Sequence, residues 1–100
     1  MDAINAPVER IWELLTEPRR YSEWADAEQD GPAPAVVSTG DMITLRTRAM
    51  LRWWKVIFRI GKIEPMHSIE IEVTLPLGIV NHEVITLRPA TAGGVLVAFN

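Results

Sequence analysis

His82 and Glu72 come closest in this sequence to an acid–base pair. A turn at Pro65-Met66 and another centred on Leu77 would place Arg59 opposite Glu72, and Glu72 opposite His82. Glu72 could then orient His82 for proton transfer. The alternative is a solvated ladder of charges across the strands, worth about 0.2–1 kcal/mol per pair. We favour the ladder, because the apolar residues beside Glu72 alternate onto the other face.

Glu83 is a second candidate, because it shares its parity with Asn81, Ile85 and Leu87. A carboxylate on an apolar concave face is costly unless it is hydrogen-bonded, and burial there would raise its pKa toward that of a general acid or base. The alternative places Asn81 and Glu83 at an open rim in contact with solvent. We favour the rim, since no inward histidine or serine is expected beside them.

The sequence offers few residues for metal binding, thiol catalysis or cofactor chemistry. The chain has no cysteine and two histidines, of which His67 is expected at a surface turn and His82 on a strand. The sequence contains no Ser-His-Asp order, phosphate loop or dinucleotide fingerprint. We therefore expect no metal and no cofactor, and a binding protein rather than an enzyme.

A basic and aromatic segment stands out between Asp41 and Glu64. It holds six of the ten basic residues and no acidic one, and Met50, Leu51, Trp53 and Trp54 cluster near its middle. This pattern suits docking on anionic lipid or aromatic contacts to a nucleic acid. The alternative, which we favour, has Trp54 facing the core while the bases balance acidic residues elsewhere. That alternative leaves Met50 and Trp53 for a partner chain to cover.

The elements that position these residues belong to one domain of 100 residues, with 48% hydrophobic and 23% charged residues. The net charge of −3 argues against general nucleic-acid binding. Neither a signal peptide nor an apolar run of about 18 residues is present, so a cytoplasmic location is the expectation.

Two short helices should open the chain. Pro7 suits the first helical position, and Val8, Ile11, Trp12 and Leu15 form one apolar stripe. A shorter helix carrying Tyr21 and Trp24 should follow Pro18. The segment 26–40 is expected to be mainly loop, with a short strand around Ala35 to Val37.

After Gly40 the apolar period changes to two, which predicts strands over residues 42–48, 55–60, 68–75, 79–88 and 95–99. Short turns between them predict an antiparallel meander. Two helices followed by a run of strands predict an α+β fold whose sheet closes around a helix.

Three segments carry a family resemblance: Ile4-Asn5-Ala6-Pro7-Val8-Glu9-Arg10-Ile11-Trp12, Ile60-Gly61-Lys62-Ile63-Glu64-Pro65, and Asn81-His82-Glu83 through Leu87-Arg88-Pro89 with Gly93-Gly94. Together with the order of elements, they resemble the polyketide cyclase/dehydrase and lipid-transport branch of the START-related (SRPBCC) superfamily.

The resemblance implies a helix-grip fold, in which a curved antiparallel sheet wraps a helix and leaves a cavity for a hydrophobic ligand. The ligand-binding residues it implies here are Trp12, Trp54, Phe58, Ile60, Ile71, Val73, Asn81, Glu83, Ile85 and Leu87.

Relative to that family, residues 1–100 are expected to be a single domain truncated at both ends. Only Met1 to Ile4 match the first strand, and the family's C-terminal helix has no counterpart after Phe99. We expect apolar sheet surface to remain uncovered, and a homo-oligomer to form when a second copy supplies the missing wall or continues the sheet.

The leading hypothesis is binding or transport of a hydrophobic small molecule, such as a lipid or a polyketide-like compound. One alternative is a cyclase or dehydratase with Glu83 as its acid–base residue. Another is an interaction module that pairs through an exposed apolar sheet face. No nucleic-acid partner is expected, and membrane contact is the less favoured option.

Overall fold

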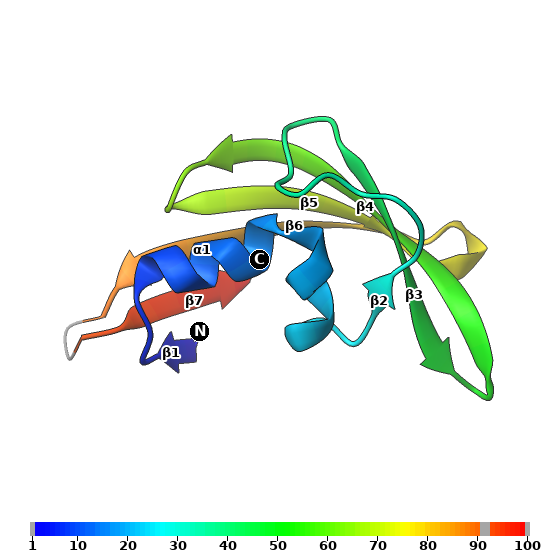
Figure 1. The fold of residues 1–100 in the computed structure, drawn as a ribbon, viewed down its shortest axis with the longest axis horizontal. Coiled ribbons are helices and arrows are strands. Elements are labelled where there is room, and N and C mark those ends of the chain that lie inside the picture. The colour runs from blue at the N-terminus through cyan, green and yellow to red at the C-terminus, as the bar shows by residue number, and fades with distance from the viewer. Residues whose placement is uncertain (1, 91–92, 100) are drawn as a thin grey trace.

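The computed structural model describes residues 2–90 and 93–99 of the chain. Seven antiparallel strands form one curved sheet in the order β1-β7-β6-β5-β4-β3-β2, and helix α1 lies in its concave side (Figure 1). The strands are β1 (Asp2–Ile4), β2 (Glu28–Gln29), β3 (Met42–Ala49), β4 (Arg52–Glu64), β5 (Ser68–Thr74), β6 (Val80–Pro89) and β7 (Val95–Phe99). The helices are α1 (Val8–Thr16) and two 3₁₀ helices, η1 (Pro18–Glu23) and η2 (Pro76–Gly78). The predicted α+β fold, with a curved sheet and two short N-terminal helices, is confirmed.

Helix α1 begins one residue later than its sequence signal predicts. Pro7 is the N-cap rather than the first helical residue, and its carbonyl oxygen accepts hydrogen bonds from the backbone N–H groups of Arg10 and Ile11 at 3.1 and 3.3 Å. Ile11 and Leu15 are buried, and Trp12 packs partly buried against the core. The apolar stripe of this helix therefore faces the sheet, as predicted.

The far end of α1 is closed by residues that follow it. The carbonyl oxygens of Leu14, Leu15 and Thr16 would have no intrahelical partner at a helix end. They accept hydrogen bonds from the indole Nε1 of Trp24 at 2.6 Å, the hydroxyl of Tyr21 at 2.9 Å and the backbone N–H of Val37 at 2.8 Å. Helix η1 and the segment after it are thereby fixed over the sheet.

The register of the meander matches the prediction. Arg59 pairs with Glu72 and Glu72 pairs with His82, while Phe58 pairs with Val73 and Ile71 with Glu83. The turn between β4 and β5 is centred on Met66, because Glu64 pairs with Ser68. A turn at this position, without any irregularity, would place Arg59 opposite Val73 instead of Glu72. A β-bulge at Gly61-Lys62, opposite Glu70, removes the shift.

The core lies between the concave face of the sheet, α1, η1 and the segment that contains Val37. The six apolar residues expected to line that face are between 1% and 9% exposed: Phe58, Ile60, Ile71, Val73, Ile85 and Leu87. The expectation that they would stay wet in a single chain is therefore wrong. Tyr21, fully buried with its ring 5.7 Å from that of Phe58, is part of the cover that the sequence argument left out.

The N-terminal segment and the segment before β3 supply the two edge strands of the sheet. The predicted strand at Ala35 to Val37 is wrong: Ala35 and Val36 form a bend, and Val37 has no regular secondary structure. The edge strand instead comes earlier, where Glu28 and Gln29 pair with Arg46 and Leu45. Strand β1 pairs with β7 from Asp2 opposite Val97 to Ile4 opposite Val95. None of the helices in the described part of the chain is long and apolar enough to cross a membrane.

Candidate functional site

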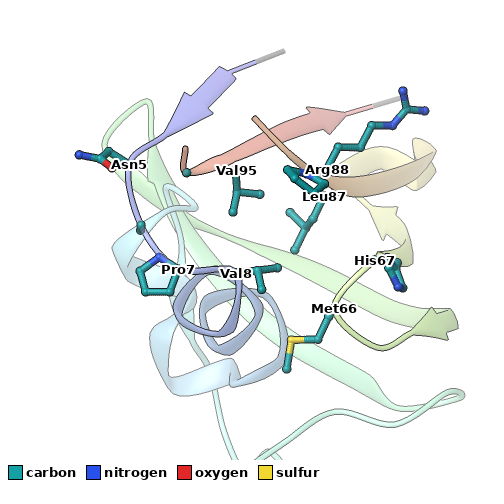
Figure 2. A pocket seen from close by; sticks show the side chains of 11 residues that line it. Asn5, Pro7, Val8, Met66, His67, Leu87, Arg88 and Val95 are labelled. Atoms are coloured by element: carbon teal, nitrogen blue, oxygen red, sulfur yellow. The ribbon is translucent and has the colours of Figure 1, made fainter. Parts of the chain in front are cut away.

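A pocket of about 500 Å³ opens where the start of α1, the β4–β5 turn and the β6–β7 end of the sheet meet (Figure 2). Val8, Leu87 and Val95 point into it, and the thioether of Met66 lies along one side. Leu87 and Val95 also belong to the buried core, so the floor of the pocket is the edge of that core. The floor of the pocket is therefore built on packed side chains.

Local backbone features hold the walls in place. The backbone N–H of Leu87 donates to the carbonyl oxygen of His67 at 2.7 Å, which ties the β4–β5 turn to β6. Gly94 has a φ of +76°, and a Cβ there would collide with the carbonyl oxygen of Ile4. Because Gly94 has no side chain, the residues that lead into α1 can lie against the start of β7 beside the pocket.

Polar groups are confined to the rim of the pocket. Asn5, His67 and Arg88 line it, and the side chains of His67 and Arg88 are directed away from its centre (Figure 2). The remaining lining is mainly apolar, and none of the described lining residues is a carboxylate. Such an arrangement can enclose an apolar body and leave a polar or anionic group at the mouth. Met66 adds a flexible surface that adapts to the shape of a ligand.

Leu87 is the residue that the pocket shares with the predicted ligand set. Phe58, Ile60, Ile71, Val73 and Ile85 lie together with it in the packed core, and Trp12 contacts that core from α1. The expectation that Trp54 faces the core is wrong: it is half-buried near the β3–β4 turn, under Arg52, and lies outside the core. At the other end of β6, Asn81 is exposed and Glu83 is half-buried. The structure thus brings the apolar members other than Trp54 together in the core, whereas Leu87 alone of the predicted set is among the described residues that line the pocket.

Sequence reasoning missed most of the pocket, because its lining comes from short pieces of three distant segments. The turn residue Met66 and the cap residue Pro7 carry no signal of a ligand site on their own. The usable signal in the sequence is Gly93-Gly94, two glycines directly before a predicted strand.

The row of Arg59, Glu72 and His82 lies on the convex face, as predicted. His82 Nδ1 is 3.7 Å from Glu72 Oε2, beyond hydrogen-bond distance, and the His82 side chain is 79% exposed. A shallow hollow of about 210 Å³ lies over these residues. The geometry is that of a solvated charge ladder and does not hold the imidazole in one orientation.

The β3–β4 hairpin carries a cluster of arginine and tryptophan. The Arg46 and Arg48 guanidinium carbons lie 4.7 and 5.9 Å from the ring centre of Trp53, and that of Arg52 lies 4.5 Å from Trp54. Trp54 Nε1 also donates to the carbonyl oxygen of Ala49 at 3.1 Å. These contacts stiffen the hairpin near its turn.

The clearest pKa shifts belong to residues around α1 and η1. Hydrogen bonds from Arg19 and then Arg20 lower the pKa of the Glu17 carboxyl, and the bond to Glu17 raises the pKa of Arg20. Burial raises the pKa of the Tyr21 hydroxyl well above its ordinary value.

Within residues 2–90 and 93–99, no group of three or more histidine, aspartate or glutamate side chains is placed to hold a metal ion.

No protein-family model matches the chain, and no curated protein matches it. Among solved structures, the crystal structure of DynU16, a protein in the dynemicin biosynthetic locus, is similar with a TM-score of 0.68 and 20% sequence identity. The similarity covers 98% of this chain and 34% of that one, so the chain spans about a third of the length of DynU16. At this identity the likeness shows a shared fold.

Proposed function

We propose that this domain binds a hydrophobic small molecule, a lipid or a polyketide-like compound, in the pocket between α1, the β4–β5 turn and the β6–β7 end of the sheet. The proposal treats the chain as a START-related domain of the polyketide cyclase/dehydrase-like branch. The observation that carries it is the pocket itself, which has apolar walls, a rim of three polar residues and a volume of about 500 Å³. Sites for small molecules usually enclose about 300–1,000 Å³.

Two further observations support a ligand in this place. The pocket floor is continuous with the buried core through Leu87 and Val95, so an apolar ligand would extend a surface that is already dry. The fold is also shared with DynU16, which comes from a biosynthetic locus. Arg88 is the positively charged residue among the described lining residues, and its side chain would have to turn toward the mouth of the pocket to pair with a carboxylate or an enolate on the ligand.

The acid–base alternative, which uses Glu83, has weaker support. Glu83 lies outside the described lining of the pocket, and no side-chain hydrogen bond to it occurs among the described residues. We therefore propose binding without catalysis.

Ligand binding can be tested by titrating the protein with medium-chain fatty acids and with flat aromatic compounds, followed by calorimetry and tryptophan fluorescence. We expect saturable binding by members of at least one class. Val8→Trp should fill the pocket and weaken binding by on the order of tenfold or more, a loss of about 1.4 kcal/mol or more. Val80→Trp is the matched control, because Val80 is 46% exposed and lies outside the lining residues.

A second variant tests the rim. Arg88→Gln should weaken the binding of ligands with a carboxylate several-fold and leave neutral ligands unchanged. Absence of saturable binding with both classes, or equal affinity in Val8→Trp and the unmodified protein, contradicts the proposal.

A further inference from the structure

The turn between β3 and β4 exposes two adjacent apolar side chains. Met50 is 87% exposed and Leu51 is 92% exposed, and Ala49 pairs with Arg52 directly beneath them. Both residues have positive φ, 52° and 64°, as in a two-residue type I′ turn. That turn favours Asn-Gly or Asp-Gly, so Met-Leu is a poor choice for local stability. Strain of this kind points to a role for the side chains themselves.

A ring of positive charge lies directly behind the two apolar residues. Arg46, Arg48, Arg52 and Lys55 flank the turn on its two strands. Arg46 is 3.5 Å from the carboxylate of Glu28. In the described part of the chain, the other three have no carboxylate oxygen within 4.0 Å. The hairpin is thus strongly cationic, although the whole chain carries a charge of −3.

The tryptophans hold these charges in place. Arg46 and Arg48 lie over Trp53, and Arg52 lies over Trp54, at the distances given above. Trp53 is itself 47% exposed. The hairpin therefore presents an apolar tip, with Arg52 directly behind it and Arg48 and Trp53 paired at the next level. In Figure 1 this hairpin extends at the end of the molecule away from α1, β1 and β7.

We propose that the β3–β4 hairpin, residues 46–55, docks the domain on an anionic lipid bilayer. Met50 and Leu51 enter the acyl boundary, Trp53 lies at the headgroup level, and Arg48, Arg52 and Lys55 contact lipid phosphates and carboxylates. An apolar tip with arginine and tryptophan directly behind it suits the boundary between the acyl chains and the headgroups, where both of these side-chain types are favoured. A nucleic acid fits less well, since the tryptophan faces that would stack on bases are covered by arginine and the tip is aliphatic.

This inference does not rest on the proposed ligand pocket. The pocket is lined by residues around α1, β6 and β7, and the docking residues lie on β3 and β4 at the other end of the sheet. Failure of either proposal leaves the other standing.

The test is flotation of the whole chain with vesicles of phosphatidylcholine alone and of phosphatidylcholine mixed with phosphatidylserine. We expect binding to the mixed vesicles only, weakening as salt is raised. Leu51→Asp should weaken it by about tenfold or more, because the side chain can no longer enter the acyl boundary. Aspartate tolerates positive φ, so this variant is expected to fold.

Leu77→Asp is the matched control. Leu77 is 93% exposed and has a φ of 70° in the turn between β5 and β6, but its neighbours in sequence are Pro76 and Gly78 rather than arginines. This variant should bind the mixed vesicles as the unmodified protein does. Arg48→Gln and Arg52→Gln should each weaken binding about fivefold, the value of one charge at an anionic surface.

Several outcomes would overturn the proposal. These are absence of vesicle binding, equal binding to neutral vesicles, and an equal loss in Leu77→Asp. Displacement from vesicles by a single-stranded oligonucleotide would assign the hairpin to a nucleic acid. A change of molar mass in Leu51→Asp, measured by light scattering without lipid, would assign it to a second copy of the chain.

Discussion

The carbonyl oxygen of Ile4 lies against Gly94, in the space that a side chain on Gly94 would occupy. Gly94→Ala would add both a clash with this backbone and the cost of a positive φ, about 1–2 kcal/mol for the backbone alone. We expect a loss of stability above about 2 kcal/mol in urea melts, together with weaker ligand binding. Gly93→Ala is the control: its φ is 89°, but a Cβ there would meet no atom within 4 Å. Equal effects at the two positions would show that β1 is not packed here.

The β3–β4 turn should gain stability when its residues are replaced by those that the backbone prefers. Met50→Asn combined with Leu51→Gly relieves two positive φ angles in non-glycine residues. We expect the free energy of unfolding to rise by about 1 kcal/mol or more. An increase in the urea midpoint checks this, and an unchanged or lower midpoint would mean that the turn is not strained.

Helix α1 should be essential to the core. Leu15 is 4% exposed, and Leu15→Ala should cost on the order of 2–5 kcal/mol because it leaves a cavity between helix and sheet. Leu77→Ala, at an exposed turn, should change stability by less than about 0.5 kcal/mol. If urea melts of Leu15→Ala show a loss as small as that of Leu77→Ala, the helix is not packed as described.

Stability should fall in alkaline solution because of Tyr21. Burial raises the pKa of this hydroxyl in the folded protein above the value of 10.0 for the free side chain. A group whose pKa is raised on folding contributes stability below its unfolded pKa and loses it as the pH rises further. Urea midpoints should therefore decline above about pH 10 in the unmodified protein, and less steeply in Tyr21→Phe. The chain has one tyrosine, so phenolate absorbance reports this group alone, and ionisation at the free value without unfolding would contradict the assignment.

Self-association remains a proposal, and the structure changes the form we expect it to take. The core is closed in a single chain, so a second copy is not needed to cover the concave face. Strand β1, the edge strand beside β7, has three residues, so a second copy would instead continue the sheet at this edge. Light scattering over a dilution series should show a mass that falls with dilution. A monomer mass at every concentration would exclude it.

The strand register could be predicted because alternation fixes the face of every side chain, and the turn at Leu77 has the predicted centre. The predicted pairing of Arg59 with Glu72 is also correct, although the prediction did not include the β-bulge in β4. The turn lies half a residue beyond its predicted centre, and the bulge at Gly61-Lys62 restores the register. Alternation does not reveal a bulge, whereas Gly61, whose Cβ would lie 3.2 Å from that of Glu70, marks its place.

The cover of the core could not be predicted in the same way. Tyr21 and Val37 come from a 3₁₀ helix and a loop, where no period identifies a buried face. The pocket escaped prediction for a related reason, since proximity of Val8, Met66 and Val95 depends on how three chain segments meet. Both features are tertiary, and neither depends on the pattern of one segment.

The way α1 ends also bears on the order of folding. Its last carbonyl oxygens are bonded by Trp24, Tyr21 and Val37, and a helix of nine residues is shorter than the roughly 12–15 that persist alone in water. The helix therefore depends both on packing against the sheet and on residues 18–37, which bond its last carbonyl oxygens. If α1 assembles after the transition state, substitutions in it would leave the refolding rate almost unchanged and accelerate unfolding.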